Sequence, residues 1–129
     1  GVPSSLPALL RATRLGQKAS SQGFDWQQVD EVVPAVREEV EEFVEAAASS
    51  ERGAMEHELG DLLFSLANLA RHLQIDAEEA LRGASQRFTQ RFQHIETTLS
   101  QQGLRMNEVP PERLEALWQG AKAALVDSE

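Results

Sequence analysis

Two pairs of acidic residues have the types and the spacing that could build a metal site. Glu39 and Glu42 are three positions apart, and so are Glu58 and Asp61. Residues three apart on a helix share one face, one turn from each other. Two such helices packed antiparallel would gather four carboxylates, which repel one another unless cations hold them. Because hard oxygen ligands favour Mg²⁺, with Mn²⁺ as the second candidate, the pattern predicts a metal centre that acts on phosphates.

The alternative is that these residues only keep a helix face in water, which is the usual role of acidic helix residues. A helical projection at about 100° per residue predicts one apolar stripe on each helix: Val33, Val36, Val40, Phe43 and Ala47 on the first, and Met55, Leu59, Leu62, Leu63, Leu66, Ala70 and Leu73 on the second. Glu39 and Glu58 flank the stripe centres at roughly 80°, and Glu42 and Asp61 follow at roughly 140°. Both pairs are therefore predicted to line the shoulder of a buried face, which solvation alone does not require.

The length and charge of the chain limit its class. With 129 residues it is long enough for one domain with its own core, and we predict a single domain over residues 1–129. Gly1 stands where a start methionine is expected, so we expect a fragment of a longer chain. The net charge of -9 argues against a nucleic-acid partner, because such proteins present a basic surface.

Membrane and disulfide features are missing from the sequence. No apolar run approaches the roughly 18 residues of a transmembrane helix, and no signal peptide is visible. The chain has no cysteine, which excludes disulfides and thiolate metal sites. We therefore predict a cytoplasmic protein with no membrane partner.

The pattern of the whole chain favours helices. Apolar residues recur at helical spacing, and no convincing strand alternation is present. Ser5 and Asp30 are candidate N-caps, Asp76 with Glu79 resembles a capping box, and Gly103 is a candidate helix-ending glycine. The predicted helices cover about residues 6–22, 30–48, 54–73, 76–103 and 111–126. The predicted fold class is all-α, a bundle of four to five helices that dimerisation completes.

Phe64 is the residue that suggests dimerisation. It lies roughly 160° from the centre of the apolar stripe of its helix, so in a monomer it would face water. Its helix also carries Glu58 and Asp61. We therefore expect this helix to be covered on a second side, and a homodimer would provide the cover.

Several other chemistries lack the residues that they require. No histidine follows a glutamate by three positions, so a ferritin-like di-iron site is excluded. There is no Gly-x-x-x-x-Gly-Lys loop and no nucleophile elbow. His57 falls on a polar face and is expected to be solvated, while His72 and His94 have no obvious partner. Metal-assisted phosphoryl chemistry remains.

Cations for the outer phosphates are available later in the chain. Arg87 and Arg91 are four apart and share a helix face, where they could bind phosphate or could simply form an exposed basic face. Lys18 and Lys122 are weaker candidates.

These motifs together resemble one known family. Glu39-x-x-Glu42 followed by Glu58-x-x-Asp61 is similar to the acidic signature of the MazG-type all-α nucleoside triphosphate pyrophosphohydrolases, and the chain resembles the C-terminal MazG domain over nearly its whole length. The other matching segments are Leu6-Pro7-Ala8-Leu9 with Arg11-Ala12, Gly23-Phe24-Asp25-Trp26, Arg37-Glu38-Glu39, Gly60 to Phe64, Asn68-Leu69-Ala70-Arg71, Arg87-Phe88, Arg91-Phe92, and Trp118 with Lys122.

The resemblance implies a dimeric, Mg²⁺-dependent enzyme that hydrolyses nucleoside triphosphates to monophosphate and pyrophosphate, with water attacking the α-phosphorus. The metal ligands implied are Glu39, Glu42, Glu58 and Asp61. Glu38 is expected to contact one of these metal-ligating residues and not the metal itself. Either Glu39 or Glu42 would also orient or deprotonate the water. The predicted phosphate- and nucleotide-binding residues are Lys18, Trp26, Arg87, Arg91 and Lys122.

Some positions depart from the family pattern. Gly16 replaces a common Gln, Ser85 a common Asn, and Gln90 the first Arg of a common Phe-x-Arg-Arg-Phe pattern. These changes leave base preference open. Two alternatives therefore stand beside the main hypothesis: a non-catalytic nucleotide-binding or dimerisation half of a tandem protein, and a base-selective dUTP or dCTP pyrophosphatase.

Overall fold

The structure, a computed structural model, describes residues 1–26 and 28–126 and is all-α in this part of the chain. The helices are α1 (Ala8–Ser21), α2 (Val29–Ser49), α3 (Arg52–His72), α4 (Ala77–Gln101), a short 3₁₀ helix η1 (Met106–Glu108) and α5 (Pro111–Ala124). The predicted all-α class is confirmed for these residues, and each predicted helix is present. None of the described helices has the length and apolarity needed to cross a bilayer.

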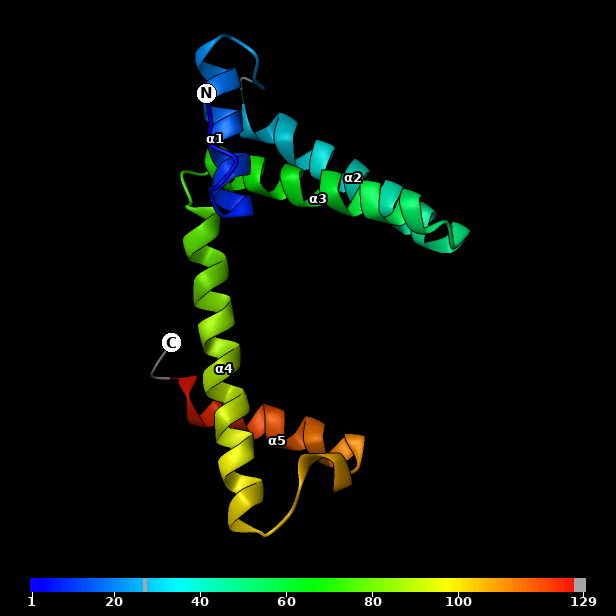
Figure 1. The fold of residues 1–129 in the computed structure, drawn as a ribbon, viewed down its shortest axis with the longest axis vertical. Coiled ribbons are helices and arrows are strands. Elements are labelled where there is room, and N and C mark those ends of the chain that lie inside the picture. The colour runs from blue at the N-terminus through cyan, green and yellow to red at the C-terminus, as the bar shows by residue number, and fades with distance from the viewer. Residues whose placement is uncertain (27, 127–129) are drawn as a thin grey trace. The chain divides into compact units, whose positions relative to one another are not determined.

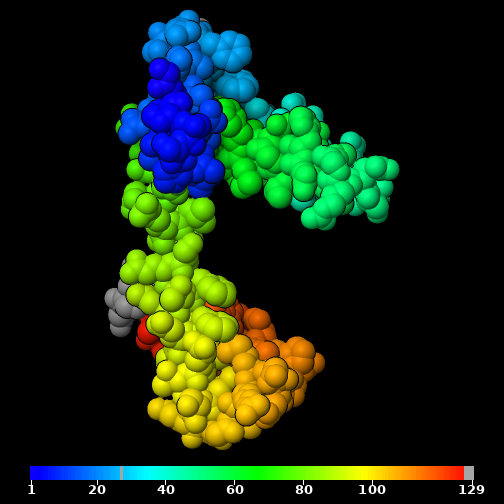
Figure 2. All heavy atoms as spheres, viewed as in Figure 1, coloured from blue at the N-terminus to red at the C-terminus, as the bar shows by residue number. Residues whose placement is uncertain are grey.

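The chain divides into two compact units, Gly1–Ala80 and Leu81–Glu129, which are described separately. In the first unit α2 and α3 run antiparallel and side by side, and α1 packs on α3 (Figure 1). The space-filling view shows α1 (blue) lying against green residues of α3 (Figure 2). Ser50, with a φ of 61°, and Glu51 make the tight connection between α2 and α3.

The buried side of α2 differs from the predicted stripe. Val32, Val36 and Ala46 are buried, whereas Val40, the middle of the predicted stripe, is 42% exposed. The prediction was only partly right: Val36 belongs to both sets, and the buried side is rotated by roughly 60° from the predicted stripe, towards Glu39.

The same correction applies to α3. Leu59, Leu63 and Leu66, which were assigned to its core stripe, are 43–47% exposed, while Leu62 is half-buried and Ala67 is buried. The first unit therefore leaves an apolar face uncovered on the α2–α3 pair.

The second unit has a small core of its own. Buried residues from α4, the loop after it and α5 form this core: Ile95, Leu99, Val109 and Ala121. Gly103, with a φ of 71°, ends α4: its N–H donates to the Ser100 carbonyl, and the Leu104 N–H donates to the Leu99 carbonyl. This Schellman geometry confirms the predicted role of Gly103.

The helix N-termini were predicted less well. Ser5 and Asp30 do not cap α1 and α2, which follow Pro7 and Gln28 without any side-chain cap. Asp76 does act as predicted, since its Oδ1 accepts the Glu79 N–H at 3.1 Å. Asp30 instead lies inside the first turn of α2, and Ser5 stands three residues before the start of α1.

Candidate metal centre

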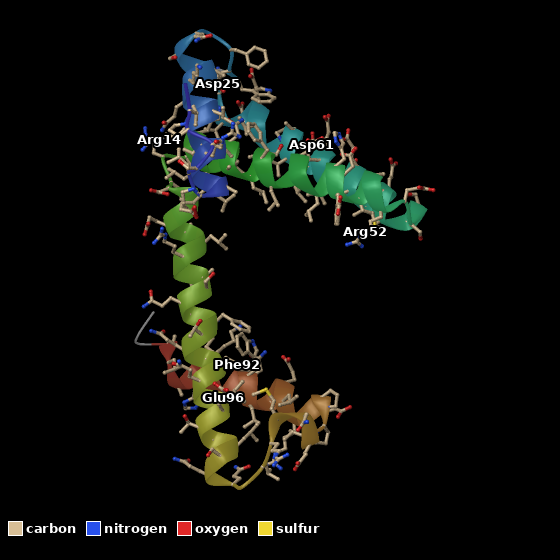
Figure 3. The ribbon with its side chains drawn as sticks, viewed as in Figure 1. Arg14, Asp25, Arg52, Asp61, Phe92 and Glu96 are labelled. Carbon is tan, nitrogen blue, oxygen red and sulfur yellow. The ribbon has the colours of Figure 1, made fainter. Side chains whose placement is uncertain are left out.

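The four predicted acidic residues gather between α2 and α3. One carboxylate oxygen each from Glu39, Glu42 and Glu58 lie within 4.8 Å of one another, and a second group of the same tightness joins His57, Glu58 and Asp61. Glu58 belongs to both groups and connects them. Figure 3 shows Asp61 part-way along the α2–α3 pair.

Helical spacing places two of these residues inside the helix pair. On α2, Glu39 follows buried Val32 and Val36 at steps of four and three, and buried Ala46 lies seven residues further on. On α3, Glu58 shares its side with half-buried Leu62. Glu39 and Glu58 are accordingly half-buried, deeper than the shoulder position predicted from the sequence, whereas Glu42 and Asp61 are exposed.

Burial leaves this carboxylate cluster electrostatically unsatisfied. Oε2 of Glu39 and Oε2 of Glu58 are buried and have no hydrogen-bond partner. Burial, and next the negative charge of Glu42, raise the pKa values of both Glu39 and Glu58 above their ordinary range; Asp61 adds to the effect, and at Glu58 the nearby His57 opposes it. A divalent cation would remove both penalties, so this hard-oxygen donor set fits Mg²⁺ or Mn²⁺.

His57 is a possible nitrogen ligand that the sequence did not suggest. Its side chain is exposed, as predicted, but its Nε2 lies 3.3 Å from Oδ2 of Asp61, one turn along α3. Imidazole nitrogen favours transition metals over Mg²⁺. The second group is therefore less selective for magnesium than the group of three glutamates.

A second polar cluster joins the connector after α1 to the end of α3. Nη2 of Arg71 donates to Oδ1 of Asp25 at 2.8 Å and to Oδ1 of Asn68 at 2.6 Å, and Nε2 of His72 lies 2.9 Å from Oδ1 of Asp25. The hydrogen bond from Arg71 holds the pKa of Asp25 well below its usual range. His72 thus has a partner that sequence reasoning missed.

A pocket of about 560 Å³ opens beside this second cluster. Its apolar lining includes Phe24, Trp26 and Phe64, and Asn68 and Arg71 are among its polar residues. Phe64 is part-exposed, as predicted, but the structure gives it a place in a pocket wall. Figure 3 labels Asp25, which belongs to the connector between α1 and α2 and also lines the pocket.

The predicted nucleotide-binding residues fall in both units. Trp26 lines the pocket, and Lys18 is exposed in the last turn of α1. In the second unit the guanidinium of Arg91 lies 5.6 Å from the centre of the Trp118 ring, a cation–π contact. Arg87 and Lys122 are exposed there. Glu38 is exposed on α2, beside Glu39.

An all-α chain with carboxylates gathered between two antiparallel helices has the architecture expected of an all-α nucleotide hydrolase. Residues 27–96 match the MazG nucleotide pyrophosphohydrolase domain, which is more than half of the chain. The chain belongs to the MazG nucleotide pyrophosphohydrolase family, as the sequence motifs predicted.

Named relatives agree with this family. The chain is 40% identical over 128 residues to the nucleoside triphosphate pyrophosphohydrolase of Escherichia coli K12, covering 98% of this chain and 49% of the relative. It is 42% identical over 117 residues to the nucleoside triphosphate pyrophosphohydrolase/pyrophosphatase MazG of Thermotoga maritima, covering 91% of this chain and 45% of the relative. The chain thus spans about half the length of these curated relatives.

Proposed function

We propose that this chain hydrolyses nucleoside triphosphates to nucleoside monophosphate and pyrophosphate in a Mg²⁺-dependent reaction. The observation that carries the proposal is the gathering of Glu39, Glu42 and Glu58, two of which bury an oxygen without a hydrogen-bond partner. Such a cluster suits a hard divalent cation, and the names of the relatives supply the reaction type.

In this proposal Glu39, Glu42, Glu58 and Asp61 hold Mg²⁺, with Mn²⁺ as an alternative. Bound Mg²⁺ would neutralise phosphate charge and polarise the phosphorus that is attacked. Glu38 is exposed on α2, directly before Glu39. In this proposal it contacts one of the metal-ligating glutamates and not the metal itself.

The attacking group is a water molecule. Its oxygen bonds to the α-phosphorus while the bond from that phosphorus to the bridging oxygen breaks, and pyrophosphate leaves with that oxygen. Glu39 or Glu42 orients this water or takes its proton.

The remaining predicted residues provide contacts to the nucleotide. Lys18, Arg87, Arg91 and Lys122 supply cations that the phosphates need in a chain with a net charge of -9, and Trp26 supplies an aromatic surface. Lys18 and Trp26 lie in the first unit and the other three in the second, and each is proposed as a separate contact to the nucleotide.

The functional assembly proposed is a homodimer. Val40, Leu59, Leu63 and Leu66 are exposed on the α2–α3 pair, and helical geometry places them on the side opposite Glu42 and Asp61. An uncovered apolar face of this kind is typical of a protein–protein interface. A second copy could cover it without closing the acidic side.

The reaction can be tested with Mg²⁺ and the eight common NTPs and dNTPs, with dUTP as a further substrate. Monophosphate and pyrophosphate as products would support the proposal, and diphosphate and phosphate would contradict it. Turnover of only dUTP or dCTP would favour the base-selective alternative. Absence of any product would favour a non-catalytic nucleotide-binding or dimerisation module.

A further inference from the structure

The carboxylate cluster between α2 and α3 contains two groups of candidate metal ligands with different chemistry. The first group consists of Glu39, Glu42 and Glu58, whereas the second joins His57 to Glu58 and Asp61. His57 supplies the only imidazole in either group. Mg²⁺ is a hard cation that prefers oxygen ligands, while imidazole nitrogen suits Zn²⁺ and other first-row transition metals. The two groups are therefore expected to select different ions.

His57 and Asp61 have the spacing of a ligand pair on a helix. They are four residues apart on α3, so their side chains lie on one face, one turn from each other. Two zinc ligands of the metalloproteases use the same spacing of four on a helix. Because one regular helix carries both side chains, they can bind the same ion without a change in the backbone.

The distance between the two ligand atoms fits a tetrahedral ion. Nε2 of His57 lies 3.3 Å from Oδ2 of Asp61. Ligands bound at about 2.0–2.1 Å in tetrahedral geometry lie about 3.3–3.4 Å apart, whereas adjacent ligands of an octahedral Mg²⁺ lie about 2.8–3.0 Å apart. A well-formed N–H···O hydrogen bond is also shorter, at about 2.7–3.2 Å. The observed distance is thus the one that two ligands of a zinc ion would have.

Glu58 supplies a third ligand to this group. One of its carboxylate oxygens lies within 4.8 Å of the ligand atoms of His57 and Asp61. Its Oε2 is buried and has no hydrogen-bond partner, a cost in free energy that a bound cation removes. Three protein ligands with a fourth position left open is the arrangement of zinc sites that also bind water or substrate.

The second group is open to solvent and can be occupied together with the first. The His57 side chain is 71% exposed and that of Asp61 is 48% exposed, so an ion can enter from water. Each carboxylate has two oxygens, so Glu58 and Asp61 can each contribute to both groups. Binding of an ion by the second group therefore does not require loss of the Mg²⁺ proposed among the glutamates.

We propose that His57, Glu58 and Asp61 form a separate cation position that binds Zn²⁺ more tightly than Mg²⁺, and that His57 is the residue that sets this preference. The inference rests on the proposed function in one respect, because Glu58 and Asp61 also belong to the proposed Mg²⁺ site. It differs from that function in the ion selected and in the ligand that selects it.

The direct test is the imidazole nitrogen signals of the protein in NMR spectra, which do not depend on turnover. The chain has three histidines, so His72 and His94 provide internal controls in the same spectrum. In millimolar Mg²⁺, added Zn²⁺ should shift the Nε2 signal of His57 and leave the other two histidines unchanged. A His57 signal that does not move, or three signals that move alike, would contradict the proposed position.

Variants measured by calorimetry test which residue sets the preference. His57→Ala should raise the Kd of Zn²⁺ about tenfold or more, since loss of a group that only supports a metal ligand already costs about 10–100-fold. The Kd of Mg²⁺ should not change. His94→Ala, the same substitution on α4, is the matched control and should leave both values as in the wild type.

Glu39→Gln is the reciprocal variant, because Glu39 belongs to the first group and not to the second. It should weaken Mg²⁺ binding and leave the Kd of Zn²⁺ unchanged in the absence of Mg²⁺. Equal weakening of both ions would mean that they compete for one position, and the proposal of a separate position would then be wrong.

The outcomes separate this inference from the proposed reaction. If the protein hydrolyses ATP with Mg²⁺ but His57→Ala binds Zn²⁺ as His94→Ala does, the zinc position is wrong and the reaction stands. If Zn²⁺ shifts the His57 signal and His57→Ala weakens its binding while no NTP is hydrolysed, the zinc position stands and the proposed reaction is wrong.

Discussion

Glu39 of α2 and Glu58 of α3 approach each other inside the helix pair, and each buries one carboxylate oxygen that has no hydrogen-bond partner. Two carboxylates about 4 Å apart repel by up to about 4 kcal/mol at an effective dielectric constant near 20. An arrangement of this kind costs stability unless a cation joins it. The relationship between these two residues underlies the predictions below.

Loss of any acidic ligand should abolish most turnover. Alanine at each of the four positions, Glu39, Glu42, Glu58 and Asp61, should lower kcat by about a hundredfold or more, since a charge-stabilising group typically contributes about 3 kcal/mol. Glu41→Ala is the matched control, because Glu41 is exposed on the opposite side of α2. Equal losses in the control and in the four variants would remove the basis for assigning these ligands. Steady-state kinetics with ATP and Mg²⁺ provide the measurement.

Mg²⁺ should stabilise the folded protein. A ligand that binds only the native state at a hundred times its Kd adds about 2.7 kcal/mol. The Tm should therefore rise with Mg²⁺ concentration, and Asp61→Asn should reduce the rise. A Tm that stays constant up to millimolar Mg²⁺ would argue against a preformed site. Differential scanning calorimetry with Mg²⁺ and with a chelator measures this change in Tm.

The metal-free protein should lose stability as pH rises. The pKa values of Glu39 and Glu58 are raised in the folded state, so these groups disfavour folding once they ionise. The loss begins near the ordinary value of 4.5 and is complete above the raised values. Glu39→Gln removes part of it, so this variant should be more stable than the wild type at about pH 7.5 and should lose that advantage near pH 4.5. A difference in Tm that does not change with pH would contradict the raised pKa of Glu39.

The contribution of the Asp25–Arg71 hydrogen bond to stability should show the opposite pH dependence. The pKa of Asp25 is lowered by Arg71, so its contribution to stability is present above its ordinary value of 3.8 and is lost as pH falls below that. Asp25→Asn should lower the Tm at neutral pH, and the difference from the wild type should shrink in acid. A constant difference from pH 7 to pH 3 would mean that the charge of Asp25 is not what stabilises the connector.

The uncovered apolar face of the α2–α3 pair, which is formed by Val40, Leu59, Leu63 and Leu66, should be a dimer interface. Leu63→Asp places a charge where an apolar partner is expected, so sedimentation should show a dimer for the wild type and a monomer or loss of folding for the variant. Leu81→Asp, at an exposed position on α4, serves as the control. A Leu63→Asp protein that sediments and melts like the wild type would show that this face stays in water.

The sequence predicted the helical fold and the gathering of the carboxylates between two helices, though not their depth, because helical spacing is a local property. Helical spacing puts Glu39 and Glu42 on one face of α2, and Glu58 and Asp61 on one face of α3. Packing of the two helices then brings the two pairs together. The side of each helix that is buried was predicted less well: on α2, Val32 lies outside the predicted stripe and is as apolar as Val40 within it, and only the packing partner decides which of them is buried.

Contacts between distant segments were not predictable from spacing. Asp25 and Arg71 are far apart in the chain, and nothing in the local pattern of either residue indicates the other. His72 was judged to lack a partner for the same reason. Gly16 could have drawn attention as a glycine inside a helix, but its close approach to Arg71 required the structure.

The phosphorus atom that water attacks can be identified by hydrolysing ATP with Mg²⁺ in water enriched in oxygen-18. Mass spectrometry then shows which product carries the heavy oxygen. We expect AMP to carry the heavy oxygen and pyrophosphate to carry none, because the water oxygen bonds to the α-phosphorus. Heavy oxygen in pyrophosphate, or ADP and phosphate as the products, would contradict the proposed reaction.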